Sequence, residues 1–178
     1  MRLFTGLSLP PETATTIGQL CQELRAISTV KLSWTPVEKL HITTKFIGEF
    51  PEGRLAELCE ALSSIHVDSI DVRIHGLGWL PNALYASVDL TAPLIALVSA
   101  TEAALEPLGI AKKKRRYRPH VTLARMRHSS VSALRKVHSS IAESHAFTLG
   151  IFRVTAFSLY LSASGKYTEL NKFTFSRE

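Results

Sequence analysis

The chain has 178 residues, of which 46% are hydrophobic and 20% are charged. These proportions are typical of a soluble globular domain and exclude a largely disordered chain. No stretch approaches the roughly 18 consecutive apolar residues of a membrane helix, and residues 1–8 lack the long apolar region of a signal peptide. We therefore expect a cytoplasmic protein with no membrane-spanning segment.

The net charge of +6 favours anionic partners, because a positive field attracts polyanions over long distances. The excess is concentrated in one place. Six Lys and Arg residues lie within residues 112–118, and Arg125 and Arg127 follow shortly after. Such a run is also typical of a solvated loop or a nuclear localisation signal, so by itself it does not identify a function.

Strand-like and helix-like segments alternate along the chain. Residues 3–9 resemble a strand that ends at Pro10, after which apolar residues at helical spacing predict a helix that includes residues 17–24. Further helices are predicted at residues 55–62, from a capping Thr91 to Gly109, and from residue 129 or 130 to residue 141. The remaining predicted strands are residues 33–34, 41–47, 69–74, 83–88, 120–124, 147–151, 152–161 and 167–175.

The order of these elements indicates the fold class. Residues 69–74 and 83–88 are expected to form a hairpin around Pro81 and Asn82. No long linker divides the chain, so we predict an α+β or mixed α/β protein, a single domain of residues 1–178 with helix-covered sheets. Because no apolar helix face is left unexplained, we expect a monomer.

Two short segments share one pattern. Residues 41–43 and 120–122 are each His-x-Thr with a β-branched residue in the middle, and both lie in predicted strands. Because side chains alternate across a strand, each histidine shares a face with its threonine. Either histidine alone would more simply be a hydrogen-bonded residue at a sheet edge. Two copies in similar strands favour one shared site.

Paired histidines and threonines suit phosphodiester chemistry. Two facing imidazoles can act as general base and general acid, because an ordinary pKa of about 6.5 allows one to be neutral and the other protonated. Here those imidazoles belong to His41 and His120. The hydroxyls of Thr43 and Thr122 can donate hydrogen bonds to a phosphoryl oxygen held between them, while the basic segment attracts the anion.

The sequence lacks the motifs of several other kinds of catalysis. It has no close Asp/Glu cluster for magnesium, no Gly-rich phosphate loop, no His-Glu-x-x-His and no Gly-x-Ser-x-Gly. A zinc site using both motif histidines would lack an obvious third ligand. We therefore expect no metal ion and no other cofactor.

The segments around the two motifs resemble the 2H phosphoesterase superfamily, and within it the bacterial and archaeal RNA 2′,3′-cyclic phosphodiesterases once called 2′-5′ RNA ligases. The similar segments run from "RLFTGLSLP" through "WTPVEKLHITTKFIGEF", "GLGWLPN" and "RPHVTLAR" to "FSLYLSASGKYTEL". The resemblance implies a bilobal α+β fold, with two pseudo-symmetric lobes of antiparallel sheet and flanking helices around a central cleft. It also implies that His41 and His120 are the catalytic pair and that Thr43 and Thr122 bind the phosphate.

Further site residues follow from the same resemblance. Arg125 lies five residues after the second histidine, at a position implied to contact the substrate, and Phe46 lies where an aromatic ring can line the base pocket. Strand alternation adds Lys45 as a phosphate ligand on the face of His41. Tyr160 and Tyr167 could stack on a base, although both are more simply sheet residues.

Two departures from the family pattern affect what can be expected. Thr44 stands where a leucine is usual in the first motif, which should change packing more than chemistry. The turn "LSASGK" is shorter than the family often has, and loops beside a cleft commonly contact the ligand. Substrate length and base preference therefore do not follow from the resemblance.

The resemblance implies hydrolysis of an RNA or nucleotide 2′,3′-cyclic phosphate to a 2′-phosphomonoester, with weak 2′-5′ RNA ligation as the reverse reaction. It further implies that His41 protonates the departing 3′ oxygen and His120 activates water. The symmetry of the motifs leaves these roles open. Two alternatives remain, namely a non-catalytic RNA-binding module and a 2H phosphoesterase acting on a small cyclic phosphate or a 2′-5′ linked oligonucleotide.

Overall fold

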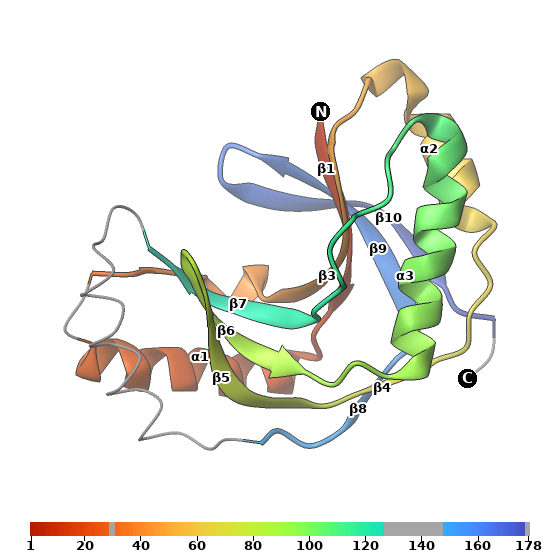
Figure 1. The fold of residues 1–178 in the computed structure, drawn as a ribbon. Helices are drawn as coiled ribbons and strands as arrows, with labels where there is room; N and C mark the ends of the chain where they lie inside the picture. The colour runs from red at the N-terminus through yellow and green to blue at the C-terminus, as the bar shows by residue number, and fades with distance from the viewer. Residues whose placement is uncertain (29–30, 127–147, 177–178) are drawn as a thin grey trace.

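The computed structural model describes residues 1–28, 31–126 and 148–176 (Figure 1). The helix predicted from residue 129 or 130 to residue 141 lies outside these ranges, as do Arg127 and the first residue of the strand predicted at 147–151. In the described part of the chain, no helix is both long and apolar enough to cross a membrane.

Eight strands of the described residues form one antiparallel sheet. Their spatial order is β10 (Lys166–Thr174), β9 (Ala156–Ala163), β1 (Arg2–Ser8), β3 (His41–Glu49), β7 (His120–Arg125), β6 (Ala83–Val88) and β5 (Ile74–Leu80), and β2 (Ser33–Trp34) also pairs with β7. A separate pair consists of β4 (Ile70–Val72) and β8 (Phe152–Val154). The two motif strands, β3 and β7, are thus neighbours in the middle of the sheet (Figure 1).

Three α-helices of the described part of the chain pack beside these strands. α3 (Ala92–Leu105) packs against β3, and α2 (Leu55–Ser63) packs against α3 and β10 (Figure 1). α1 (Pro11–Ile27) has proline in its first turn and buries apolar residues at helical spacing, namely Ile17, Leu20, Cys21 and Leu24. Short 3₁₀ turns lie at η1 (Val37–Lys39), η2 (Glu52–Arg54) and η3 (Glu106–Leu108). The predicted α+β class is confirmed.

The ends of α3 agree only in part with the sequence prediction. Gly109 follows η3 with a positive φ of 83°, so the predicted stop is confirmed. Thr91 occupies the N-cap position, but its hydroxyl is buried and makes no hydrogen bond with any residue that the structure describes. The predicted side-chain cap at Thr91 is therefore wrong.

The predicted hairpin around Pro81 and Asn82 is present, with residues 83–88 as its second strand, but its first strand is residues 74–80 and not residues 69–74. The strand that pairs with β6 is β5, while β4 pairs with β8. Within this hairpin, the ring of Tyr85 in β6 lies over Gly78 in β5. A Cβ at Gly78 would lie 2.4 Å from the Tyr85 hydroxyl oxygen, so a larger residue there would require the Tyr85 ring to move.

The predicted strand of residues 152–161 divides into two. β8 pairs with β4, whereas β9 joins the large sheet between β10 and β1. Of the strand predicted at 147–151, Thr148 makes an isolated bridge with His75, and residues 149–151 form no strand.

The core lies between the large sheet and the helices. Ile42 of β3 and Val121 of β7 are both fully buried, as are Leu3 and Leu7 of β1. Ile42 pairs with Val121 in the ladder that joins β3 to β7. We interpret this ladder as the junction of two lobes within one domain, one built on β3 and the other on β7.

Candidate active site

The register between β3 and β7 brings the two predicted motifs together. In an antiparallel ladder, pairing of Ile42 with Val121 sets His41 across from Thr122 and Thr43 across from His120. Since Ile42 and Val121 point into the core, the two histidines and two threonines share the opposite face of the sheet. We call this common face of His41, Thr43, His120 and Thr122 the motif face.

Both histidines are held in the same way by the backbone. Nδ1 of His41 lies 2.7 Å from the carbonyl oxygen of Lys39, and Nδ1 of His120 lies 2.8 Å from the carbonyl oxygen of Arg118. A carbonyl oxygen can only accept, so each Nδ1 carries the proton and donates. Nε2 is therefore the nitrogen left for chemistry on each ring.

The first motif also has an internal contact. Nε2 of His41 lies 2.9 Å from Oγ1 of Thr43. When His41 is neutral, Nε2 has no proton and the Thr43 hydroxyl donates to it. A phosphate bound at Thr43 would compete for that hydroxyl and would lie beside Nε2.

Burial lowers the pKa of His41 below its ordinary value, and the positive charges of His120 and Arg125 lower it further. The hydrogen bond to the Lys39 carbonyl acts in the opposite direction without reversing the shift. His41 is therefore neutral at neutral pH in the free protein.

A β-bulge in each motif strand decides which later side chains reach the motif face. In β3, Gly6 pairs with Thr43 and Thr5 with Lys45, so Thr44 is the extra residue. In β7, Tyr85 pairs with Thr122 and Leu84 with Ala124, so Leu123 is the extra residue. Each bulge shifts the alternation of side chains by one residue. The side chain on the motif face is therefore the fifth after the histidine and not the fourth.

These fifth positions are Phe46 and Arg125. Both side chains are exposed, Phe46 to 49%, and the Phe46 ring lies 6.2 Å from the Phe4 ring, which in turn lies 4.9 Å from the His41 ring. The structure thus brings the two predicted residues toward the predicted histidines. Their contact with a substrate stays a prediction.

Lys45 lies on the other face, so the prediction from strand alternation is wrong. Its side chain is 1% exposed, and Nζ donates to Oε1 of Glu102 at 3.0 Å and to the carbonyl oxygen of Ala111 at 2.7 Å. The Thr44 bulge is the physical reason, because it turns the fourth position after His41 into the protein. Lys45 therefore connects β3 to α3 through its contact with Glu102 and does not face the cleft.

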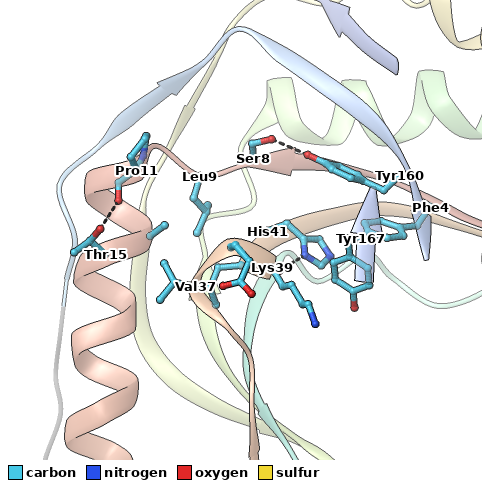
Figure 2. Close-up of a pocket in the computed structure, with 13 residues that line it drawn as sticks. Phe4, Ser8, Leu9, Pro11, Thr15, Val37, Lys39, His41, Tyr160 and Tyr167 are labelled. Atoms are coloured by element: carbon cyan, nitrogen blue, oxygen red, sulfur yellow. Dashed lines mark hydrogen bonds between the residues drawn. The ribbon is translucent and has the colours of Figure 1, made fainter. Parts of the chain in front are cut away.

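Aromatic side chains surround His41. The ring of Tyr167 meets the His41 ring edge-on at 5.3 Å, and Tyr160 stacks on Phe4 at 5.1 Å (Figure 2). Tyr160 and Tyr167 are sheet residues, as the simpler interpretation held, and they also line a cavity of about 520 Å³ beside His41. We call this space the His41 cavity. Phe4 was missed, because a strand aromatic that is only 4% exposed resembles a core residue.

The second motif borders a different space. A groove of about 1040 Å³ is lined by Thr43, Phe46 and His120 and by five basic residues, namely Lys113, Lys114, Arg115, Arg116 and Arg118. We call it the basic groove. Nζ of Lys113 lies 4.7 Å above the Phe46 ring, a cation–π contact, and Tyr85 meets His120 edge-on at 5.3 Å. The basic run predicted from the sequence therefore reaches the motif face.

Tyr117 connects the basic groove to the first motif. Its hydroxyl donates to the carbonyl oxygen of Thr43 at 2.9 Å, and burial raises the pKa of the phenol, which keeps it a hydrogen-bond donor. Sequence reasoning missed this residue, since the bond joins positions 74 residues apart. No local pattern signals such a contact.

The described residues contain no group of three or more His, Cys, Asp or Glu side chains placed to share a metal ion. The absence of a metal requirement remains a prediction for solution assays.

Two neighbouring His-x-Thr strands, whose motif side chains share one face of the sheet in an α+β fold, are the arrangement expected of a 2H phosphoesterase. The family model described as LigT like Phosphoesterase matches residues 7–88, which include the first motif. The RNA 2′,3′-cyclic phosphodiesterase of Methanocaldococcus jannaschii is 28% identical over 166 residues, which cover 91% of each chain. That of Bacillus subtilis is 27% identical over 180 residues, covering 97% of this chain and 96% of its own.

Solved structures agree on the fold. The crystal structure of TT0787 of Thermus thermophilus covers 100% of both chains with a TM-score of 0.78 and 23% identity. The chain is therefore similar to the LigT-like 2H phosphoesterases, with RNA 2′,3′-cyclic phosphodiesterase homologues over most of its length. The resemblance drawn from the two motifs is confirmed.

Proposed function

We propose that this chain hydrolyses the 2′,3′-cyclic phosphate at an RNA or nucleotide end to a 2′-phosphomonoester, without a metal ion or other cofactor. The observation that carries the proposal is the motif face, on which both Nδ1 atoms are held by carbonyls and both Nε2 atoms are left for the reaction. The names of the Methanocaldococcus jannaschii and Bacillus subtilis relatives support the same activity.

The proposed reaction needs one base and one acid on opposite sides of phosphorus. A neutral imidazole takes a proton from water, and the water oxygen bonds to phosphorus. The bond from phosphorus to the 3′ oxygen breaks, and an imidazolium protonates that oxygen. Thr43, Thr122 and Arg125 would hold the phosphoryl oxygens while negative charge builds up on them.

We assign the acid to His41 and the base to His120, as the family resemblance implies. The lowered pKa of free His41 means that this acid must gain its proton when substrate binds. A phosphate anion between the rings supplies the reason, because its negative charge offsets the repulsion from His120 and Arg125. The roles are thus set in the complex rather than in the free protein.

Ligation follows from the same step with a different nucleophile. If a 5′-hydroxyl of a second RNA takes the place of water, the product is a 2′-5′ linkage in place of a 2′-phosphomonoester. His120 then deprotonates the hydroxyl and His41 again protonates the 3′ oxygen. We expect weak ligation wherever hydrolysis occurs, without ATP.

The test is to incubate the protein in EDTA with an oligoribonucleotide ending in 2′,3′-cyclic phosphate and to determine which oxygen keeps the phosphate. We expect a 2′-phosphate from the wild type and at least about 100-fold less from His120→Ala. A 3′-phosphate product, or activity that returns only when a divalent metal is added, would contradict the proposal.

Two further outcomes point to the alternatives. If neither protein forms product while both bind RNA in a salt-sensitive way, the chain is an RNA-binding module that uses its basic run. If only a small cyclic phosphate or a 2′-5′ linked oligonucleotide is cleaved, the chemistry stands and the RNA substrate is wrong.

A further inference from the structure

We propose that Tyr117 is a positioning residue, which holds His120 in line with the first motif across the junction of the two motif strands. The inference rests on the proposed function and adds to it a residue that belongs to neither motif. It predicts that the Tyr117 hydroxyl contributes to turnover through His120 and not through contact with the substrate.

The direct junction between the two motif strands is short. β3 pairs with β1 at seven positions, and β7 pairs with β6 at five. In the described part of the chain, β3 and β7 pair with each other at one position, Ile42 with Val121. Each motif strand is therefore held firmly by its outer neighbour, while the ladder between the two motifs is a single pair.

Both ends of β7 have a further contact. At its last two residues, Ala124 and Arg125, the strand pairs with β2. Just before its first residue, the hydroxyl of Tyr117 donates to the carbonyl oxygen of Thr43 at 2.9 Å. Because β7 begins at His120, the Tyr117 contact secures the end of the strand at which this histidine lies.

A short path of hydrogen bonds leads from the first motif to the His120 ring. The hydroxyl of Tyr117 is bound to Thr43, and the carbonyl oxygen of the next residue, Arg118, lies 2.8 Å from Nδ1 of His120. Pro119 follows, which fixes its own φ and restricts the backbone of Arg118 to extended conformations. A fixed Tyr117 side chain therefore limits where the Arg118 carbonyl lies, and with it the His120 ring.

Tyr117 differs from the basic run around it. Residues 112–116 and Arg118 are exposed, whereas Tyr117 is partly buried and packs against the hydrophobic core. Six positive charges within residues 112–118 repel one another and favour an open segment. The Tyr117 ring is thus a neutral anchor for the segment that leads into the second motif.

Two other roles for Tyr117 make different predictions. Tyr117 also lines the basic groove, so a hydroxyl that binds substrate would raise KM when it is removed. A hydroxyl that only stabilises the fold would lower the melting temperature and leave kcat unchanged. A positioning role lowers kcat, because the reacting groups are then misaligned in the bound complex.

The first variant is Tyr117→Phe, which keeps the ring and removes the hydroxyl, assayed on the oligoribonucleotide that ends in 2′,3′-cyclic phosphate. Since a misplacement of about 1 Å can cost about 100-fold, we expect kcat to fall by about 10- to 100-fold and KM to change by less than about threefold.

Thr101→Val is the matched control. It removes another buried hydroxyl, which donates to the carbonyl oxygen of Leu97 at 2.7 Å within α3. We expect this variant to lower the melting temperature without lowering kcat. A comparable loss of kcat in Thr101→Val would assign the Tyr117→Phe defect to stability alone and overturn the proposal.

Combining Tyr117→Phe with His120→Ala tests whether the tyrosine acts through the histidine. Residues that act as a unit are not additive, so the second substitution should lower the residual kcat of His120→Ala by less than about threefold. The proposal is overturned if the full defect of Tyr117→Phe persists in this background, if Tyr117→Phe alone keeps the wild-type kcat, or if it raises KM alone.

Crystal structures of the wild type and Tyr117→Phe give a readout that does not need turnover. We expect the His120 ring to move by about 1 Å relative to Thr43 when the hydroxyl is removed. If the wild type hydrolyses no cyclic phosphate, the proposed function is refuted, and the structures alone decide the positioning role. An unmoved His120 ring would overturn it.

Discussion

The two motif strands are built alike. In each, the histidine donates from Nδ1 to the carbonyl of the residue two positions before it, and the threonine two positions after it shares its face. The third residue after it is the bulge, the fourth is buried and the fifth is exposed. The same local construction therefore presents the same groups from both strands.

The surroundings of the two histidines differ. His41 packs among Phe4, Tyr160 and Tyr167 beside a cavity without net charge. His120 contacts Tyr85 and opens into the basic groove. These different surroundings provide a physical basis for the asymmetric reaction that we propose for a symmetric pair of strands.

The largest expected effect is the loss of turnover when either motif histidine is replaced, and it tests whether both motifs are needed for the reaction. His41→Ala and His120→Ala should each lower kcat on the cyclic-phosphate oligonucleotide by about 10²–10⁴. Because acid and base act in one step, the double variant should be far less impaired than the product of the two defects. Near-normal turnover of either single variant, with an unchanged melting temperature, would rule out the two-histidine mechanism.

A substrate with sulfur in place of the bridging 3′ oxygen tests the different roles proposed for His41 and His120. A thiolate leaves without protonation, so the defect of His41→Ala should shrink by at least about tenfold on this substrate. The defect of His120→Ala should persist, because water still has to be deprotonated. The measurement is the wild-type to variant rate ratio on each substrate. The reverse pattern would exchange the two roles.

The lowered pKa of His41 gives a smaller effect that can be measured directly by NMR titration of the free protein. We expect His41 to titrate below about 6.5, and Arg125→Gln to raise this pKa because a positive charge is removed. The unfolded chain binds this proton more tightly, so His41 should make the fold less stable as pH falls below about 6.5. His41→Ala identifies the resonance, and titration at or above 6.5 would contradict the assigned burial.

Much of this architecture could be predicted because its signals are local. Alternation placed His41 with Thr43 and His120 with Thr122, and the apolar spacing of α1 reflects its buried face. The ladder between β3 and β7 could not be derived from either strand alone. What the chemistry did predict is that the two motifs share one site, since two half-sites act together only if they meet.

The features that were missed depend on residues distant in sequence. The bulge at Thr44 is defined against β1, and that at Leu123 against β6, so neither motif shows that its alternation shifts. The contact of Tyr117 with Thr43 and the place of Tyr85 over Gly78 likewise join separate segments. The prediction that Lys45 shares the face of His41 is wrong because it extends strand alternation past the bulge at Thr44, which is defined by pairing with β1.

Lys45 therefore provides the last test of the comparison, since its counterpart in β7 is the buried Ala124. Lys45→Met removes the donor to Glu102 and Ala111, and leaving such acceptors unpaired typically costs about 1–3 kcal/mol. We expect that loss in urea unfolding, with kcat/KM changed far less than in the histidine variants. Glu102→Gln, which weakens the same contact from α3, is the matched control. If Lys45→Met instead keeps its stability and loses kcat/KM, the ammonium binds substrate and the fourth position is not equivalent in the two strands.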